Sequence, residues 1–388
     1  MLYIHNAVIY TPGLRIKNGA LLIEGNRIIE LGPAEQATPP AKGQQLDASG
    51  LSIVPGFIDL QLNGGFGLDF TAAPDAIWPV AAQLPQYGVT SFLPTIITAP
   101  LETIRHAQST LAQGPPPGWA GAMPLGLHLE GPFLNPQKKG AHSSAYLREP
   151  SLAAVEGWSA ACGVKLVTLA PELPGALAVA AALVERGVAV SAGHSTATIA
   201  QARAGFEAGI NYGTHLFNAM PPLHHREPGL AGALLAHPTA KIGLISDGVH
   251  VHPDLVKLIW QLAGPERLTL VTDAMAALGM GPGHYQLGDY AVTVDETSAR
   301  LADGTLAGSI LSADVALRNL IAFTGCSLPE ALLALTRAPA ALLGLSDQKG
   351  ILAAGGDADL VLLSADLQVV MTIVQGQIVY QKESLPWG

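Results

Sequence analysis

The sequence predicts an α/β protein, a (β/α)8 TIM-like barrel with a small β-sandwich-like satellite domain formed by both chain ends. In the middle of the chain, short runs rich in Val, Ile and Leu alternate with Ala-rich stretches, which is typical of a parallel sheet buried on both faces. At both ends, short strand-like segments are separated by turn signals. Polar residues gather where the apolar runs of the middle segment end, which is where (β/α)8 enzymes carry their chemistry.

Eight apolar runs are the expected barrel strands, and a chain of 388 residues can hold a barrel of about 250 residues with a modest satellite. The runs are Ile53 to Leu62, Val89 to Ile96, Pro124 to Glu130, Val164 to Ala170, Val188 to His194, Ile210 to His215, Lys241 to Asp247 and Leu268 to Asp273. Helical patterns lie between most of them, for example at Leu152 to Ala161, Ala176 to Arg186 and Thr198 to Ala208. The connection between the sixth and seventh runs has the least helical pattern.

The two chain ends predict one β domain, made of residues 1–52 together with 350–388, and residues 53–349 form the predicted barrel. The expected strands of the first end are Leu2 to Tyr10, Ala20 to Glu24 and Arg27 to Leu31. Those of the second end are Asp359 to Leu363, Gln368 to Val374 and Gln377 to Gln381. Two β-rich ends that flank one long segment can pair into a single satellite sheet.

Composition and charge disfavour several classes of protein. The formal net charge is −10, and no basic run is longer than Lys138-Lys139, so a nucleic-acid partner is not expected. Apolar runs such as Ala176 to Val184 are far shorter than the roughly 20 residues of a membrane span. Cys162 and Cys326 are too few for a disulfide framework, and the first residues lack the pattern of a secretory signal. We therefore expect a cytoplasmic protein without a membrane span.

Two histidines and one glutamate at strand ends predict a divalent metal site. Glu130 ends the third run, His194 the fifth and His215 the sixth. Two imidazoles and a carboxylate leave a fourth tetrahedral position open for water on Zn²⁺, although Fe²⁺, Co²⁺ and Mn²⁺ accept the same ligands. Either histidine alone is more simply interpreted as a hydrogen-bonded strand-end residue. Three such ligands on separate strands favour a catalytic metal.

Asp273, at the end of the eighth run, is the candidate general base, although an aspartate before the helix-compatible Ala274 to Ala277 can also be a helix N-cap.

Metal-dependent barrel hydrolases often place a His-x-His pair at the end of the first strand. Here Gln61 and Asn63 occupy those two positions and form a candidate first-strand site. Because amides are poor Zn²⁺ ligands, we expect one metal ion per chain rather than two.

Along nearly its whole length the chain resembles the amidohydrolase superfamily and, within it, the deacetylases of N-acetylglucosamine 6-phosphate. The motifs that carry the resemblance are Pro55 to Gly64, His128 to Phe133, Gly193 to Ser195, Thr214 to Met220, Ile245 to His250, Val271 to Met275 and Leu306 to Ser309. The resemblance implies that Glu130, His194 and His215 hold the metal. It implies that Asp273 acts first as general base and then as general acid, and that the products are acetate and glucosamine 6-phosphate.

The resemblance also implies a set of substrate contacts: Ala141, His142, Asn218, Ala219, Arg226, His250, Leu306, Ala307 and Gly308. Arg226 offers a permanent cationic fork for phosphate, and His142 and His250 can donate hydrogen bonds to oxygen atoms. These residues would give an acidic chain the local positive charge that an anionic substrate needs. Judged without the resemblance, Arg226 and His142 could equally be surface residues of loops. The resemblance further implies a homodimer in which Arg226 or His250 can reach the partner subunit's site.

Two other functions stay open. An amidohydrolase that acts on a cyclic amide, such as dihydroorotate, typically uses two metals bridged by a carboxylated lysine, but the fourth run carries Lys165 near its start rather than at its end. A catalytically silent barrel that only binds sugar phosphates would need neither an open metal position nor a base. The sequence does not set the choice between the glucosamine and galactosamine configurations.

Overall fold

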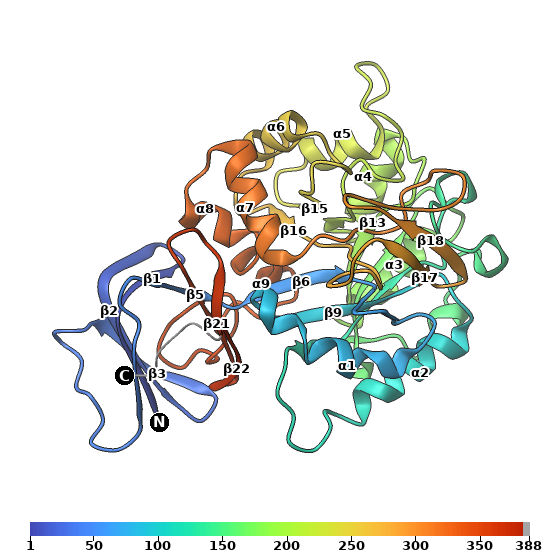
Figure 1. Ribbon diagram of the computed structural model, residues 1–388. Coiled ribbons are helices and arrows are strands. Elements are labelled where there is room, and N and C mark those ends of the chain that lie inside the picture. Colours follow the sequence, from blue (N-terminus) through green and yellow to red (C-terminus); the bar gives the residue numbers. More distant parts are fainter. Residues whose placement is uncertain (383–388) are drawn as a thin grey trace.

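Within residues 1–382, which the computed structural model describes, eight parallel strands form a barrel (Figure 1). In spatial order they are β6 (Phe57–Leu62), β9 (Val89–Ile97), β11 (Leu127–Glu130), β12 (Val164–Leu169), β13 (Ala189–Ala192), β14 (Tyr212–Gly213), β15 (Lys241–Leu244) and β16 (Leu268–Leu270). The short β10 (Met123–Pro124) also pairs with β9. A bridge between Leu62 and Ala274 joins the end of the first strand to the segment that follows the last one, so the predicted barrel is confirmed.

Helices cover the outside of the barrel (Figure 1). They are α1 (Ile77–Ala81), α2 (Leu101–Ala112), α3 (Ala176–Glu185), α4 (Ile199–Glu207), α5 (Gly229–Ala236), α6 (Pro253–Ala263), α7 (Ala313–Thr324), α8 (Leu328–Leu333) and α9 (Arg337–Leu342). Helix α4 begins with a capping box in which Thr198 and Gln201 bond to each other's backbone N–H. Helix α5 occupies the connection with the least helical sequence pattern. None of the helices in the described part of the chain has the length and apolar character needed to cross a bilayer.

The helix expected over Leu152 to Ala161 is wrong. The structure has two short 3-10 turns there, Ala153–Val155 and Ala160–Cys162. Gly157, between the two turns, has a φ of +81°, a left-handed conformation that ends a right-handed helix.

The first expected strand, Ile53 to Leu62, is two strands in two different sheets. Its first part is β5 (Ser52–Pro55), which pairs with strands of the chain ends, and its second part is the barrel strand β6. Gly56 lies between them and packs so closely on Thr90 that a Cβ atom there would come 2.1 Å from the Thr90 Oγ1. The chain can pass from one sheet into the other at this point because glycine has no side chain.

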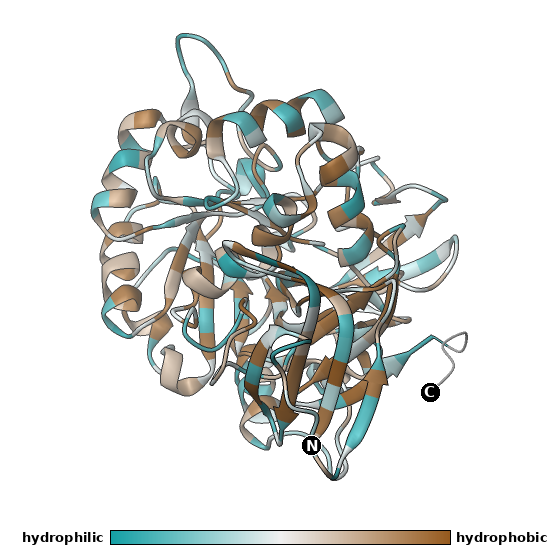
Figure 2. Ribbon diagram, turned by 90° about the vertical axis from the view of Figure 1, so that its left-hand side faces the viewer, coloured by the Kyte–Doolittle hydropathy of each residue, from teal (hydrophilic) through white to brown (hydrophobic). Residues whose placement is uncertain are grey.

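The chain ends build a separate sheet beside the barrel, as expected (Figures 1 and 2). Its order is β22 (Gln377–Gln381), β21 (Val369–Val374), β20 (Leu360–Leu363), β5, β1 (Leu2–Thr11), β2 (Leu14–Glu24) and β3 (Arg27–Pro33), with β4 (Gln44–Asp47) also paired to β1. Ile4, Ile9, Leu21 and Met371 belong to its own apolar core. The division of the chain at residues 52 and 350 stays our proposal, and its last residues, 383–388, lie outside the described part.

An insertion that the apolar pattern did not reveal follows the last barrel strand. It consists of β17 (Gly283–Leu287), β18 (Tyr290–Val294) and β19 (Ala299–Arg300), which form an antiparallel sheet (Figure 1). The small β7 (Gly64–Gly65) and β8 (Leu68–Asp69) lie near it, and Asp69 accepts a hydrogen bond from the Gly288 N–H. The insertion packs on the strand-end segments of the barrel through a small apolar cluster. It therefore covers the end of the barrel where the polar residues gather.

A buried cation joins the barrel to the sheet of the chain ends. Lys349 Nζ lies 2.9 Å from Asp357 and 2.5 Å from Asp359, and all three side chains are at most 15% exposed. Despite the cost of burial, the two carboxylates raise the pKa of Lys349, so the ion pairs are formed at neutral pH.

We expect Lys349→Met to lower the free energy of unfolding by about 3–5 kcal/mol, because two buried carboxylates lose their cation. Chemical denaturation followed by circular dichroism measures the change. The matched control is Lys17→Met in β2, where the lysine is exposed and the change should be small. Equal stability of the two variants would contradict this role of Lys349.

Candidate metal centre and substrate cavity

A cavity of about 670 Å³ opens at the carboxyl ends of the barrel strands, a volume in the usual range of small-molecule sites. Its floor contains Glu130, His194, His215 and Asp273, which come from four different strands. Glu130 ends β11, whereas the other three lie two or three residues beyond β13, β14 and β16. The structure thus brings the four predicted strand-end residues together in one cavity.

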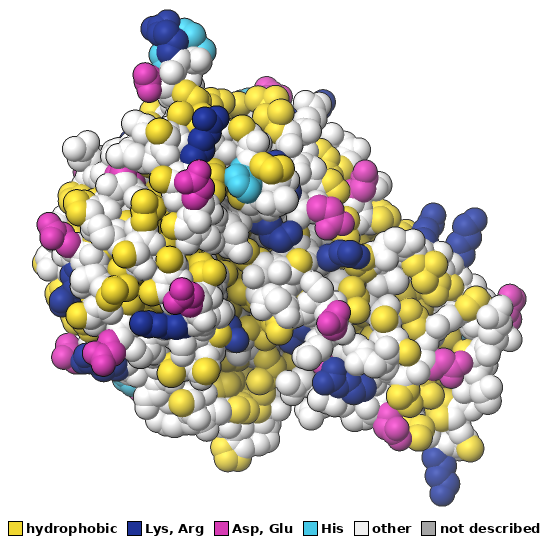
Figure 3. Space-filling model, turned by 180° about the vertical axis from the view of Figure 1, so that it is seen from behind, with side chains coloured by type: hydrophobic (Ala, Val, Ile, Leu, Met, Phe, Trp, Pro, Cys, Tyr) yellow, Lys and Arg dark blue, Asp and Glu magenta, His cyan; other side chains and the backbone are white. Residues whose placement is uncertain are grey.

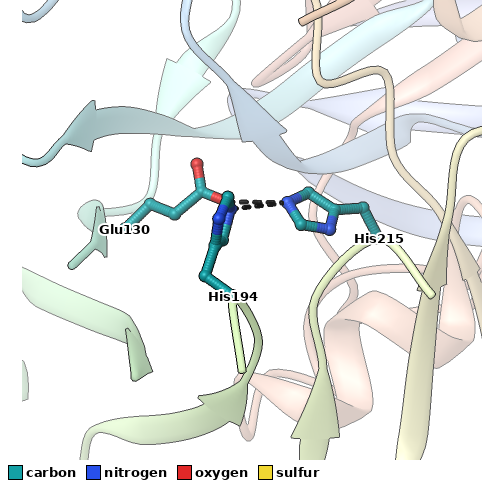
Figure 4. A group of neighbouring side chains, drawn as sticks. All are labelled: Glu130, His194 and His215. Atoms are coloured by element: carbon teal, nitrogen blue, oxygen red, sulfur yellow. Dashed lines mark hydrogen bonds and ion pairs between the residues drawn. The ribbon is translucent and has the colours of Figure 1, made fainter. Parts of the chain in front are cut away.

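Three atoms of Glu130, His194 and His215 form a compact triangle (Figure 4). Glu130 Oε1 lies 3.1 Å from His194 Nε2 and 2.9 Å from His215 Nε2, and the two nitrogens are 3.1 Å apart. A tetrahedral ion with ligands about 2.0–2.1 Å away has ligand atoms about 3.3 Å from one another. The spacing is thus close to that of a metal site.

The protonation of His194 also fits a metal ion. Its Nδ1 lies 2.8 Å from the Lys138 carbonyl oxygen, which can only accept, so Nδ1 carries the proton and Nε2 of the neutral ring has a free lone pair. That lone pair faces His215 Nε2, and two protonated nitrogens could not face each other at 3.1 Å. A divalent cation satisfies all three inward-facing atoms at once.

The backbone at these strand ends is unusual. His194, His215 and Asp273 have φ values of +49°, +30° and +49°, in a region that residues other than glycine rarely adopt. Each such residue costs roughly 1–3 kcal/mol, and such residues cluster at functional sites. Here the left-handed turn points each side chain into the cavity directly after its strand.

Two of the site's groups are buried carboxylates with opposite pKa shifts. Burial favours the neutral form of Glu130, but the imidazoles of His194 and His215 beside it outweigh that cost, so the pKa of Glu130 lies well below its ordinary value. Burial and the nearby charge of Glu130 raise the pKa of Asp273. Glu130 is therefore suited to hold a cation, and Asp273 is suited to exchange a proton.

The amides of the first strand point at these carboxylates. Gln61 Nε2 lies 3.0 Å from both Glu130 Oε1 and Asp273 Oδ1, and Asn63 Nδ2 lies 2.7 Å from Asp273 Oδ1. Both amides therefore act as donors to acidic groups. Asn63 lines the cavity, whereas Gln61 is buried beneath it.

His142 presents a neutral N–H to the cavity. Its Nδ1 accepts a hydrogen bond from the Thr98 backbone N–H at 3.2 Å, and because a backbone N–H can only donate, the ring proton sits on Nε2. Burial and the neighbouring His194 lower the pKa of His142 to about 3. His142 Nε2 lies 3.7 Å from Glu130 Oε2, at the edge of the triangle, where it can donate to a substrate oxygen.

His250 is held at the cavity wall by Asp247. The Asp247 carboxylate accepts hydrogen bonds from the backbone N–H groups of Val249 and His250, each at 2.8 Å, and lies 2.6 Å from His250 Nδ1. These contacts fix the imidazole, so its Nε2 is left for a ligand.

The loop after His194 is clamped by Glu172. Its carboxylate accepts hydrogen bonds from Ser195 Oγ at 2.6 Å, the Thr196 N–H at 2.6 Å and Asn135 Nδ2 at 2.9 Å. The Asn135 N–H in turn donates to the His194 carbonyl oxygen. Sequence reasoning missed Glu172 because it lies beyond its strand and has no motif of its own.

Most of the other sequence-predicted contacts line the cavity, namely Ala141, Asn218, Ala219, Leu306 and Gly308. Gly308 has a φ of +66°, and a Cβ atom there would come 2.9 Å from the Asp273 carbonyl oxygen, so the close approach requires glycine. Ala307 does not line the cavity, because its side chain is fully buried in the core of the insertion.

Arg226 also lies outside the cavity. It is exposed on a loop that projects from the barrel, at the top of Figure 1, and its guanidinium contacts His225. Figure 3 shows basic and histidine side chains gathered at the tip of this projection. A single chain therefore does not bring Arg226 to the metal triangle.

Several residues of the cavity wall were not predicted as site residues: Ile97, Gln137, Lys138, Lys139, Leu287, Arg300, Asp303 and Thr305. The pair Lys138-Lys139 follows the predicted strand-end motif around Glu130 closely in the sequence. This position could have identified the two lysines as cavity residues. Arg300, Asp303 and Thr305 come from the insertion and its following loop, whose position over the barrel has no local sequence signal.

Comparison with known proteins places the chain in a family. The sequence model described as "Amidohydrolase family" matches residues 52–379. The chain belongs to the amidohydrolase family. It is 41% identical over 389 residues to the N-acetylglucosamine-6-phosphate deacetylase of Bos taurus, covering 95% of this chain and 94% of that one.

Two further amidohydrolases are informative. The chain is 42% identical over 329 residues to the N-acetylgalactosamine-6-phosphate deacetylase of Escherichia coli O157:H7, covering 84% of this chain and 87% of that one. A mutant N-acetyl-D-glucosamine-6-phosphate deacetylase from Mycobacterium smegmatis, solved in complex with N-acetyl-D-glucosamine-6-phosphate, has a TM-score of 0.88 and 37% identity, with 98% of this chain and 99% of that chain covered.

We expect the purified chain to carry one divalent ion, and Glu130→Gln to bind it more than about 100-fold more weakly, because the change removes the negative charge of the triangle. Metal content after dialysis and competition with a chelator measure the difference. Glu156→Gln, at an exposed glutamate, is the matched control. Full retention of metal by Glu130→Gln would contradict the site.

Proposed function

We propose that this amidohydrolase removes the acetyl group from N-acetylglucosamine 6-phosphate, giving glucosamine 6-phosphate and acetate. The observation that carries the proposal is the joining of Asp273, His142 and the Glu130–His194–His215 triangle in one cavity. The relatives that share 37–42% of their residues with the chain are named deacetylases of acetamido sugar phosphates, which supports the substrate class.

Glu130, His194 and His215 would hold one divalent metal ion. Zn²⁺ is the first choice because it prefers a tetrahedral set of nitrogen and carboxylate ligands, and Fe²⁺, Co²⁺ or Mn²⁺ are alternatives. When bound, such an ion lowers the pKa of water and polarises a carbonyl group.

Asp273 would carry the proton through the reaction. Its carboxylate takes a proton from the attacking water as general base, and then donates it to the nitrogen of the departing amine as general acid. The elevated pKa that burial and Glu130 give it suits both steps. His142 Nε2–H would donate to the acetamide oxygen, where negative charge develops. Because His142 is neutral, it contributes a hydrogen bond rather than a proton.

We further propose that the phosphate is recognised in a homodimer. Arg226 lies outside its own chain's cavity, which supports its action at the partner subunit's site, whereas His250 lines the cavity of its own chain. Helix α6 presents Leu255, Leu258 and Leu262 to solvent, each more than 40% exposed, on one face of the helix. An apolar stripe on α6, which packs beside α5, is consistent with a subunit contact. Cytoplasmic localisation is part of the same proposal.

The rival functions have less support. A cyclic-amide hydrolase would place a bridging lysine at the carboxyl end of β12, but Lys165 packs against Gly126 at the opposite end of the strand. A sugar-phosphate binder without activity would not need the raised pKa of Asp273 or the metal triangle. Galactosamine specificity has one specific observation in its favour, the relative from Escherichia coli.

An acetate-release assay separates these functions. N-acetylglucosamine 6-phosphate, N-acetylgalactosamine 6-phosphate, unphosphorylated N-acetylglucosamine and dihydroorotate are compared on protein of measured metal content. We expect the phosphorylated glucosamine derivative to be the best substrate. Preference for the sugar without phosphate would overturn the phosphate contact, and binding without acetate release would favour the silent barrel.

We expect Asp273→Asn to slow acetate release by about 10²–10⁴-fold while the metal stays bound, because the amide cannot exchange the proton. Steady-state kinetics and metal analysis on the same preparation measure both properties. The matched control is Asp295→Asn, an exposed aspartate of the insertion, which should keep normal turnover. Near-normal activity of Asp273→Asn would contradict the assignment of Asp273 as general base and general acid.

Mixing two defective variants tests the shared site. Arg226→Ala and Asp273→Asn are expected to be weakly active alone at low substrate concentration. After they exchange subunits, about a quarter of the sites would combine an intact Asp273 with a partner's intact Arg226. Recovery of activity on mixing supports the homodimer with shared sites. If the mixture shows only the mean activity of its components, Arg226 does not act across subunits.

A further inference from the structure

The Asp273 carboxylate is held through one of its two oxygens. Oδ1 accepts hydrogen bonds from Gln61 Nε2 at 3.0 Å and from Asn63 Nδ2 at 2.7 Å. Among residues 1–382, no hydrogen-bond partner contacts Oδ2, although the residue lines the cavity. The two oxygens of this carboxylate therefore have different surroundings.

We infer that Gln61 and Asn63 are positioning residues for the proton-transferring Asp273, fixing Oδ1 so that Oδ2 alone faces the reacting groups. They are thus neither metal ligands nor merely part of the barrel packing. The inference rests on the proposed function, because it assigns the amides a part in that reaction.

The strand geometry explains why these two positions cooperate. Residues 61 and 63 are two apart along the chain at the end of β6, so their side chains point to the same face. Backbone bonds join the same segments, since the Asp273 N–H donates to the Gln61 carbonyl and the Asn63 N–H donates to the Ala274 carbonyl. Both amides therefore reach Asp273 from the end of β6, which lies beside the segment that follows β16.

The chemistry of an amide also explains its use here. Gln61 Nε2 lies 3.0 Å from Glu130 Oε1 as well as from Asp273 Oδ1, so one NH₂ group bridges two carboxylates that would otherwise repel each other. An amide offers two N–H donors without a net charge. The arrangement leaves Gln61 Oε1 and Asn63 Oδ1 without a hydrogen-bond partner in the described chain.

The two amides differ in one contact, and this difference makes the inference testable. Asn63 contacts Asp273 but none of Glu130, His194 and His215, so Asn63→Ala should lower kcat by about 10- to 100-fold with KM and metal affinity unchanged. Gln61→Ala should lower kcat similarly and also weaken metal binding, because Gln61 donates to Glu130. Gln108→Ala is the matched control, since Gln108 donates to two carbonyl groups far from the cavity.

A double-mutant cycle separates positioning from packing. If Asn63 acts through Asp273, Asn63→Ala should have almost no further effect on kcat in the Asp273→Ala background. A full additive loss there, or a normal kcat for Asn63→Ala, overturns the inference. Asn63→Asp, which replaces the donor with an acceptor of the same size, should reduce kcat more than alanine does. An equal or smaller loss for Asn63→Asp also overturns it.

Metal titration without substrate keeps this test separate from that of the proposed function. If the wild-type protein releases no acetate, the proposed function fails, yet the expected difference in metal affinity between Gln61→Ala and Asn63→Ala can still be measured. If both variants bind metal alike, the assigned contacts of the amides are wrong even in an active enzyme.

Discussion

The structure depends on the burial of two carboxylates side by side at the mouth of the barrel. Glu130 is 2% exposed and Asp273 is 9% exposed, and both lie within hydrogen-bonding distance of the same Gln61 nitrogen. Buried charges of one sign are tolerated only when cations or donors surround them. His194 and His215 face Glu130, whereas the two amides face Asp273. The division gives one carboxylate the character of a metal ligand and leaves the other able to exchange a proton.

The scaffold supplies these neighbours from segments that are far apart in sequence. Parallel strands end at one rim, so single residues from β6, β11, β13, β14 and β16 converge there. Left-handed backbone after three of the strands turns the side chains inward, and burial of the surrounding core offsets the cost of that conformation. The insertion then closes over the site, where Gly308 packs against the Asp273 carbonyl oxygen. The sheet of the chain ends is connected to the barrel through Gly56 and Lys349 and takes no direct part in the cavity.

Sequence reasoning succeeded where position along a strand determines position in space. Glu130, His194, His215 and Asp273 could be predicted together because carboxyl ends of parallel strands must meet. It failed where the decisive contact is distant in sequence. The apolar run Ile53 to Leu62 looks continuous, and only the packing of Gly56 on Thr90 divides it between two sheets. Arg300 and Asp303 reach the cavity because a whole insertion folds over the barrel, and no periodicity encodes that placement. The motif around Ala307 was identified, but burial of that one side chain depends on the hairpin beside it.

The three cations of the cavity wall, Lys138, Lys139 and Arg300, are each engaged within the chain. Lys139 Nζ donates to the Gly140 and His142 carbonyl oxygens. Lys138 Nζ donates to the Met220 carbonyl oxygen, and Arg300 donates to Ser298 Oγ and the Gly304 carbonyl oxygen. These contacts use part of the donor capacity of all three cations within their own chain. The exposed guanidinium of Arg226 contacts the neighbouring His225, so most of its donors stay available. In the proposed dimer, one chain would bind the acetamide and perform the proton transfer, while its partner would add the guanidinium of Arg226 to the cations of the cavity wall.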